Sequence, residues 1–217
     1  MLQGVIFDLD GVILDSHPAH KQAWKALLAS AGKQVSDQEL EVVQEGLKFE
    51  AILQHWLGEV TSEQVKHYGA RKEALLNDSQ PCLKTIDGFQ DLLQEIVAAR
   101  LPIGLASSAG RRRVDLTLEQ LGLKHHFCAI VTGDDVAQGK PDPAICRLAA
   151  RGMGVDPNHI LVCEDAVNGV EAAKRAGMKC LGIATREREP ILKHAGADKV
   201  VPDFTVVRLG DLRGLFC

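Results

Sequence analysis

Short apolar runs recur along this chain, and each is followed by a polar or glycine-containing turn and then by a helical pattern. The runs cover residues 4–10, 101–108, 128–135, 159–165 and 179–185. The helical patterns cover residues 88–100, 111–121, 143–151 and 166–176. Runs of this length, rich in Val, Ile, Leu and Ala, are typical of buried strands, and parallel strands need crossover connections that are usually helical. The sequence therefore predicts an α/β fold with a Rossmann-like, doubly wound parallel sheet.

One segment departs from this alternation. Residues 17–80 contain no strand-like run and only amphipathic helical patterns. We expect them to form a small helical unit inserted after the first strand. The sequence thus predicts an α/β core domain of residues 1–15 and 82–217 and an all-helical cap domain of residues 16–81.

Composition and charge limit the class of protein and of partner. The 217 residues are 46% hydrophobic and 25% charged, which is ordinary for a globular chain, and no apolar run approaches the roughly 18 residues of a membrane span. The first strand begins too close to Met1 for a signal peptide, so we expect a cytoplasmic protein. The six cysteines have no zinc-site spacing, and a net charge of −4 gives no general attraction to nucleic acid. We expect a monomer whose partner is a small molecule, with no nucleic-acid or membrane partner.

Polar side chains stand where the predicted strands end. In open parallel sheets, ligands bind beyond the carboxyl ends of the strands. Asp8 and Asp10 are two residues apart, so they face the same side of the first strand, and Gly11 lets the chain turn away. The other strand ends carry Ser107, Ser108, Asp134, Asp135, Glu164 and Asp165. Lys140 lies just before a predicted helix.

Carboxylates that converge repel one another unless a cation lies between them. The candidate ligands of a hard divalent cation, with Mg²⁺ as the first choice, are Asp8, Asp10, Glu164 and Asp165. A metal, a lysine and a hydroxyl around an aspartate make a site for a phosphoryl group, whose phosphorus the carboxylate attacks. Taken singly, Glu164 could cap a helix, Lys140 could be a solvated charge and Ser107 a turn hydroxyl. Their joint placement at strand ends favours the catalytic interpretation.

With these residues in hand, the sequence resembles the haloacid dehalogenase superfamily, and within it the β-phosphoglucomutase-like and phosphoglycolate-phosphatase-like branch with a helical cap. The resemblance covers essentially the whole chain. It is carried by DLDGVILDS (8–16), LASS (105–108), GKPDP (139–143) and CEDAVNGVEAAKRAGM (163–178). The true dehalogenases of this superfamily lack the second aspartate and the metal, so Asp10 favours phosphoryl transfer.

The resemblance implies a role for each motif residue. Asp8 would be the nucleophile that forms an aspartyl-phosphate, and Asp10 would be the general acid and base. Ser107 and Lys140 would hold the phosphoryl oxygens. The Mg²⁺ ligands would be Asp8, the backbone carbonyl of Asp10 and Asp165, with Glu164 as a further ligand or as their neighbour.

The cap decides between a phosphatase and a mutase. The candidate substrate-binding residues are Gly11, His20, Trp24, Gly46, Lys48, Ser107, Ser108, Arg111 and Lys140. Mutases of this branch resemble one another in carrying an arginine where Phe49 stands and a lysine where Glu45 stands, and a bidentate arginine suits a second phosphate as phenylalanine does not. This favours a phosphatase. Trp24 as cap core, His20 as a surface residue and Lys48 as a solvated charge remain alternatives.

The run of arginines at 111–113 opens a predicted helix, where positive charge opposes the helix macrodipole. We hypothesise that one of them, with Arg111 as the first candidate, binds a carboxylate or distal phosphate of the substrate beside Ser107. A solvated basic turn is the alternative.

These observations together predict a Mg²⁺-dependent phosphatase, a phosphoric monoester hydrolase, of small phosphorylated metabolites such as sugar phosphates. It would act through an aspartyl-phosphate intermediate. A sugar-phosphate mutase of the β-phosphoglucomutase type is the alternative enzyme. A phosphoacceptor module of the receiver type is the alternative from another class, and it would need neither a cap nor Asp10.

Overall fold

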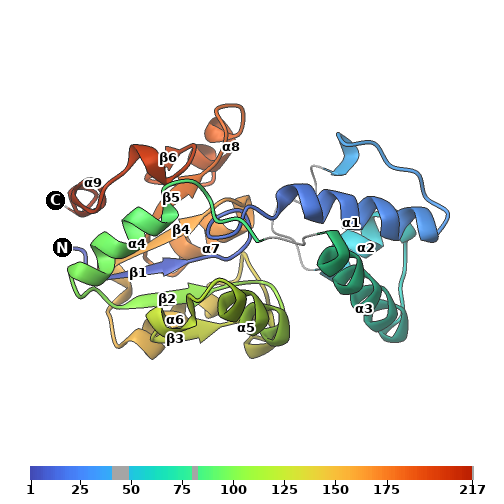
Figure 1. The fold of residues 1–217 in the computed structure, drawn as a ribbon, viewed down its shortest axis with the longest axis horizontal. Coiled ribbons are helices and arrows are strands. Elements are labelled where there is room, and N and C mark those ends of the chain that lie inside the picture. Colours follow the sequence, from blue (N-terminus) through green and yellow to red (C-terminus); the bar gives the residue numbers. More distant parts are fainter. Residues whose placement is uncertain (41–48, 80–82, 217) are drawn as a thin grey trace.

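The computed structural model describes residues 1–40, 49–79 and 83–216. Its centre is a six-stranded sheet in the order β3-β2-β1-β4-β5-β6, and every neighbouring pair is parallel (Figure 1). The strands are β1 (Gly4–Phe7), β2 (Ile103–Ala106), β3 (Ala129–Val131), β4 (Ile160–Glu164), β5 (Lys179–Ile183) and β6 (Lys199–Val201). The predicted doubly wound parallel sheet is confirmed.

Helices cover both faces of the sheet because alternate strand residues point to opposite sides. Val5 and Phe7 of β1 belong to one buried cluster, whereas Ile6 between them belongs to another. The first cluster includes residues of α4 (Phe89–Ala98), α5 (Arg111–Gln120) and α9 (Leu209–Gly214). The second includes residues of α6 (Ala144–Met153), α7 (Val167–Arg175) and α8 (Glu189–His194).

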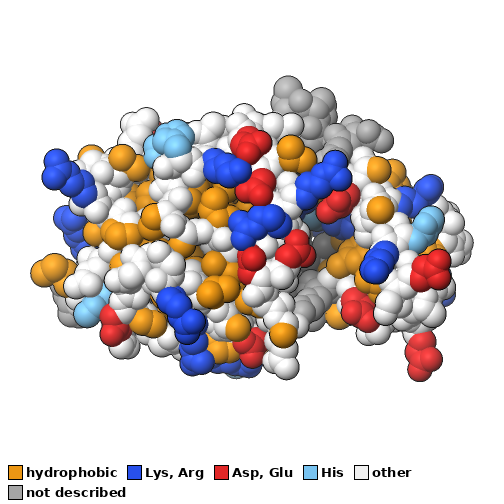
Figure 2. Space-filling model, turned by 90° about the horizontal axis from the view of Figure 1, so that it is seen from below, with side chains coloured by type: hydrophobic (Ala, Val, Ile, Leu, Met, Phe, Trp, Pro, Cys, Tyr) orange, Lys and Arg blue, Asp and Glu red, His pale blue; other side chains and the backbone are white. Residues whose placement is uncertain are grey.

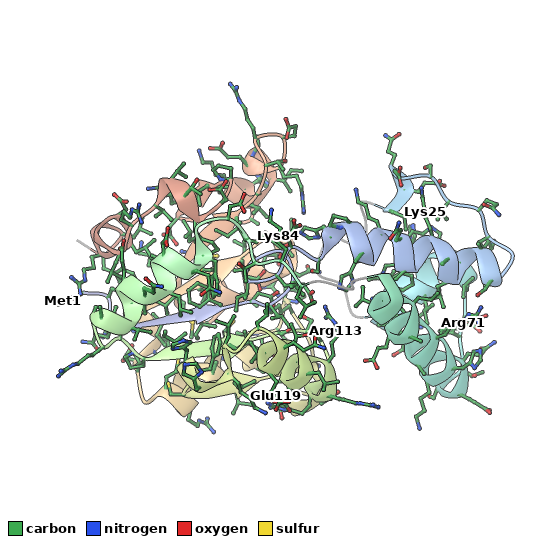
Figure 3. The ribbon with its side chains drawn as sticks, in the orientation of Figure 1. Met1, Lys25, Arg71, Lys84, Arg113 and Glu119 are labelled. Atoms are coloured by element: carbon green, nitrogen blue, oxygen red, sulfur yellow. The ribbon has the colours of Figure 1, made fainter. Side chains whose placement is uncertain are left out.

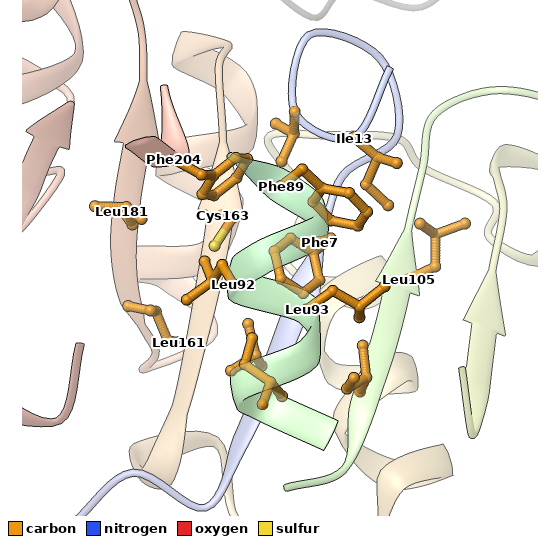
Figure 4. Close-up of a cluster of buried hydrophobic side chains, with 14 of the residues drawn as sticks. Phe7, Ile13, Phe89, Leu92, Leu93, Leu105, Leu161, Cys163, Leu181 and Phe204 are labelled. Atoms are coloured by element: carbon orange, nitrogen blue, oxygen red, sulfur yellow. The ribbon is translucent and has the colours of Figure 1, made fainter. Parts of the chain in front are cut away.

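Aromatic rings fill the centre of the first cluster (Figure 4). The Phe7 ring meets the edge of the Phe89 ring at a centroid distance of 5.4 Å, and the ring of Phe204 packs against both. All three side chains are fully buried. This packing anchors β1 directly below the point where the chain leaves the sheet.

A helical insertion follows β1 and lies to one side of the sheet (Figure 1). It contains α1 (His17–Ser30), α2 (Phe49–Leu57) and α3 (Ser62–Ser79). Trp24, Leu28 and Leu53 form the middle of a hydrophobic cluster of its own. No helix within the described part of the chain is long and apolar enough to cross a bilayer.

The register of the sheet places the carboxyl ends of β1, β2 and β4 level with one another at one edge. Phe7 of β1 pairs with Leu105 of β2 and with Cys163 of β4. The next residue along each strand is therefore level with the other two, namely Asp8, Ala106 and Glu164. Since the chain order changes direction between β1 and β4, this edge is also the topological switch point at which such sheets bind ligands.

Candidate active site

A cavity of about 340 Å³ lies between this edge of the sheet and the helical insertion. Its volume falls within the range of small-molecule sites. The predicted site residues that line it are Asp8, Asp10, His20, Trp24, Ser107, Ser108, Lys140, Glu164 and Asp165. Charged side chains of both signs gather on the face where the core meets the insertion (Figure 2).

Lys140 holds the centre of the site. Its ammonium donates to Asp8 Oδ1 at 2.6 Å, to the Ala106 carbonyl at 2.9 Å and to Glu164 Oε1. These acceptors are the three residues that the sheet register places level with one another. The Lys140 side chain is only 3% exposed, so its charge is balanced by protein groups rather than by water.

The charges of this cluster are strongly coupled. Burial lowers the pKa of Lys140, but the carboxylates of Asp8 and Glu164 outweigh burial and raise it overall. Burial raises the pKa of Asp8 well above its usual value, and although Lys140 opposes this, Glu164 and Asp165 add to it. One ammonium does not offset three buried acids, so the group favours further positive charge.

Asp165 follows β4 and faces the start of α1. His17 Nε2 lies 2.8 Å from Asp165 Oδ2, which links the insertion to the core. Gly11 lies next to this contact with a φ of +73°, and any side chain there would collide with the carboxyl of Asp165 and with the ring of His17. Gly11 therefore shapes the turn around the site, and the cavity lining does not include it.

The carboxylate of Asp10 is held from three sides. Arg113 donates to Asp10 Oδ2 at 2.6 Å through Nη1 and to Oδ1 at 2.5 Å through Nη2. Ser16 Oγ donates to Oδ1 at 2.6 Å, and His20 Nε2 lies 3.3 Å from the same oxygen. Burial alone would raise the pKa of Asp10, but the Arg113 guanidinium and His20 hold it well below the usual value.

The residues of the site fit the predicted Mg²⁺ by the chemistry of their donors. Asp8, Glu164 and Asp165 are buried carboxylates, which are hard oxygen ligands, and the pKa of Asp8 is raised first by burial and further by the charges of the other two. Within the residues that the structure describes, no group of three or more His, Cys, Asp or Glu side chains is arranged as a ready metal cage. Lys140 and His17 contact the carboxylates instead.

Some residues predicted for the substrate site do not line the cavity, and others lie outside the described residues. Arg111 does not line the cavity, because its guanidinium donates to the Ile130 carbonyl at 2.9 Å and to Asp135 Oδ2 at 2.6 Å. Asp134 accepts from the Arg111 backbone, so these acids fix the start of α5 rather than a ligand. Gly46 and Lys48, with Glu45, lie outside the described residues.

Three lining residues are not among those considered from the sequence, namely His17, Lys72 and Glu73. Phe49 and Arg113 also line the cavity, and from the sequence Phe49 is considered only for the choice between phosphatase and mutase and Arg113 only as a member of the arginine run. A helical spacing could have identified His17, because His17, His20 and Trp24 follow one another at intervals of three and four residues, which places them on one face of α1. Lys72 lies on α3, far from any motif, and no sequence signal relates it to the site.

Trp24 and His20 have more than one contact each. Trp24 is 1% exposed and stacks on Phe49 at a centroid distance of 5.2 Å, so it belongs to the core of the insertion as well as to the cavity wall. His20 Nδ1 lies 3.2 Å from the Lys72 ammonium, and His20 is not a surface residue. Burial, reinforced by Lys72, lowers the pKa of His20 to about 4, so the imidazole is neutral at pH 7.

Known proteins match both the sequence and the fold. The model of the haloacid dehalogenase-like hydrolase family matches residues 5–183. The validoxylamine A 7'-phosphate phosphatase of Streptomyces hygroscopicus subsp. limoneus is 33% identical over 211 residues, covering 96% of this chain and 97% of the relative. The fructose-1-phosphate phosphatase YqaB of Escherichia coli (strain K12) is 32% identical over 185 residues, covering 83% and 95%.

A solved structure agrees with these relatives. The HAD hydrolase, family IA, variant 3 from Entamoeba histolytica HM-1:IMSS has a TM-score of 0.89 and 25% identity, with 99% of each chain covered. The family match covers most of the chain, including the strands that carry Asp8 and Glu164. The chain therefore belongs to the haloacid dehalogenase-like hydrolases.

Proposed function

We propose that the chain is a Mg²⁺-dependent phosphatase of small phosphorylated metabolites such as sugar phosphates, and that it acts as a cytoplasmic monomer through an aspartyl-phosphate on Asp8. The observation that carries this is the pairing of buried Asp8 with the Lys140 ammonium, in the same cavity as a second carboxylate, Asp10. The phosphatases acting on validoxylamine A 7'-phosphate and on fructose 1-phosphate support the substrate class.

In the first half of the proposed reaction, a carboxylate oxygen of Asp8 attacks phosphorus and the bond from phosphorus to the alcohol oxygen breaks. Asp10, once protonated, gives its proton to that departing oxygen. Lys140 and Ser107 hold oxygens of the phosphoryl group, where the lysine charge stabilises the negative charge that develops. The products are the free alcohol and an aspartyl-phosphate.

In the second half, a water molecule attacks the phosphorus of the aspartyl-phosphate. The Asp10 carboxylate takes a proton from the water, the bond between phosphorus and the Asp8 oxygen breaks, and inorganic phosphate leaves. This step needs Asp10 in its ionised form, which is the form that Arg113 favours.

Mg²⁺ would be held by Asp8, Asp165 and the Asp10 backbone carbonyl, with Glu164 beside them. When bound, it supplies positive charge that offsets these buried acids and the oxygens of the phosphoryl group. The raised pKa of Asp8 supports this assignment, since an acid that resists ionisation among other acids gains most from a nearby cation.

Phe49 supports hydrolysis over mutase chemistry. It lines the cavity and stacks on Trp24, so it offers an apolar wall at the position where mutases of this branch carry an arginine. An apolar wall gives no bidentate contact to the second phosphate of a bisphosphate intermediate. At this wall of the cavity, water is favoured over a bound sugar phosphate as the acceptor of the phosphoryl group.

The test is phosphorus NMR of the protein with Mg²⁺ and a panel of phosphorylated sugars and acids, which includes β-glucose 1-phosphate with its bisphosphate activator. We expect inorganic phosphate from one or a few members and none with the Asp8→Asn variant. A new sugar-phosphate resonance with little inorganic phosphate would instead identify a mutase.

The Asp10→Asn variant separates an enzyme from a phosphoacceptor module. We expect it to lose turnover by about 100-fold or more, as typical for removal of a general acid and base. If Asp10→Asn becomes phosphorylated and dephosphorylated at the rates of the unmodified protein, the chain is a phosphoacceptor module and the phosphatase assignment is wrong.

A further inference from the structure

Of the three arginines in the run, only Arg113 lines the cavity. Figure 3 shows where Arg113 lies on the side of the core that faces the insertion. It lies in the first turn of α5, directly after the cavity-lining segment 107–110. Its side chain is 14% exposed, and its guanidinium donates two hydrogen bonds to the carboxylate of Asp10, one from each terminal nitrogen. The planar guanidinium is thus oriented toward an oxyanion at the boundary between the core and the insertion.

Two nitrogen-bearing side chains of the insertion, His20 and Lys72, lie near Arg113. Arg113 Nη2 lies 3.2 Å from His20 Nε2, and the Lys72 ammonium lies 3.2 Å from the other nitrogen of the same ring. Arg113 and Lys72 are both cations and His20 is neutral, while Asp10 is the carboxylate between them. Glu73 also lines the cavity, and with Asp8 it helps to raise the pKa of Arg113, but the Glu73 side chain is exposed and water screens part of its charge.

Asp10 keeps other partners if Arg113 turns toward a ligand. Ser16 Oγ and His20 Nε2 both contact Asp10 Oδ1 and belong to different parts of the chain from Arg113. A buried carboxylate is costly only when it is left without partners. The guanidinium can therefore be shared between Asp10 and a second oxyanion in the cavity.

We propose that Arg113 determines substrate specificity by binding a second oxyanion, a carboxylate or a distal phosphate, on the phosphorylated substrate. This assignment rests on the proposed phosphatase function and narrows it to substrates that carry two anionic groups. Lys140 and Asp8 receive the phosphoryl group that reacts, and Arg113, assisted by Lys72, receives the other anion. The match of a guanidinium fork to carboxylate and phosphate oxygens supports both kinds of anion.

The test uses substrates that differ in one group. 3-Phosphoglycerate and glycerol 3-phosphate differ only by a carboxylate in place of a hydroxymethyl group. Glucose 1,6-bisphosphate and glucose 1-phosphate differ only by the second phosphate. We expect the unmodified protein to favour the compound with two anionic groups in at least one pair by about 10- to 100-fold in kcat/KM. This is the ratio expected from the free energy of a charge-assisted hydrogen bond.

Variants of the arginine run then locate the effect. In Arg113→Ala the ratio of kcat/KM within each pair should fall to about one, mainly because KM rises for the compound with two anionic groups. Arg113→Lys should restore part of the preference, because it keeps the charge but not the planar guanidinium. Arg112→Ala is the matched control, since Arg112 is exposed and does not line the cavity, and it should keep the full preference. Equal preference in Arg113→Ala and the unmodified protein would overturn the assignment.

A binding measurement separates this assignment from the phosphatase function itself. Calorimetric titration of the Asp8→Asn protein with both pairs reports the anion site without turnover. If the compound with two anionic groups binds more tightly, and this difference is lost when Arg113 is also replaced, the anion site is supported even if no phosphate is ever released. Equal binding within both pairs, or no binding of any of these compounds, overturns it, whereas absence of phosphate release alone counts against the phosphatase.

Discussion

At the scale of single residues, the site depends on a lysine that is buried between two acids. Lys140 contacts Asp8 and Glu164, and its side chain has almost no contact with water. A buried ion pair of this kind adds little net stability, because both partners lost their hydration on folding. Its removal is costly, however, since the acids then remain buried without their cation.

We therefore predict that Lys140→Met, which keeps the volume of the side chain, lowers the free energy of unfolding by about 3–5 kcal/mol and abolishes turnover. Urea titration without divalent metal measures the first effect. The pKa values of Asp8 and Glu164 should rise further above their unfolded values in the variant, so these acids take up protons on folding. The deficit should accordingly shrink as the pH falls from 8 to 5.

The control is Lys124→Met, which breaks an exposed pair with Glu119. Its effect on unfolding should be much smaller and independent of pH over this range, because exposed pairs are screened by water and salt. A deficit in Lys140→Met that grows toward acid pH would contradict the assigned burial of the two acids.

The sequence was enough to predict most of the residues around Lys140, because motif residues at strand ends converge once the sheet is parallel. It did not distinguish Arg113 from Arg111. One arginine enters the cavity and the other pairs with Asp135, and that difference depends on how α5 is rotated about its axis and on where the segment after β3 places its acids. Neither property is encoded in local spacing.

At the scale of secondary-structure elements, the packing of α7 on the end of β4 positions the acids. Gly169 lies in the first turn of α7, and a methyl group there would overlap the carboxyl of Glu164. The helix can approach the strand this closely only because position 169 has no side chain. This contact fixes the Glu164 carboxylate toward Lys140.

We predict that Gly169→Ala destabilises the protein by about 1–3 kcal/mol through overpacking and lowers kcat by displacing Glu164. The matched control is another helical glycine, Gly210 in α9, where nothing lies close to the added carbon. Gly210→Ala should raise stability by up to about 1 kcal/mol because alanine favours the helix. Thermal unfolding and steady-state kinetics of both variants provide the measurement.

The elements that sequence reasoning identified are marked by an apolar run that ends in a polar or glycine-containing turn, or by an amphipathic helical pattern. The strands β1 to β5 and the helices α4, α5 and α7 lie within the predicted runs, whereas α6 begins inside its predicted range of 143–151 and continues to Met153. The predicted runs do not include β6, α8 or α9, each of which has six residues or fewer. A helix of six residues carries too little periodicity to be recognised, and β6 offers only two apolar residues. These elements form because Leu192, Val201 and Leu212 pack onto an existing sheet.

At the scale of the whole molecule, the described apolar residues separate into clusters that belong to the sheet and clusters that belong to the insertion. The sheet clusters contain Phe7 and Ile6, whereas Trp24 and Leu53 belong to a cluster of the insertion. The side chains between these clusters are mostly charged or polar residues of the cavity. This arrangement predicts that the cap unfolds locally without loss of the core.

We predict that Trp24→Ala raises the hydrogen-exchange rates of amides in α1, α2 and α3 and leaves those of β1, β2 and β4 nearly unchanged. Removal of a fully buried tryptophan typically lowers the free energy of unfolding by about 3–5 kcal/mol. Here we expect the cap alone to be destabilised. Hydrogen exchange followed by mass spectrometry measures it. Equal acceleration in the sheet would mean that the two parts unfold as one unit.

The place of β1 in the sheet also bears on how the protein is made. The ribosome synthesises β1 before β2 and β4, yet these two strands are its neighbours, with Val5 opposite Ile103 of β2 and opposite Leu161 of β4. The nascent chain therefore holds the strand of Asp8 without its pairing partners while the cap helices, whose contacts are local, already have their full sequence. The catalytic edge is complete only after the chain has grown past Asp165, so a truncated or stalled product would carry a cap and a nucleophile but no active enzyme.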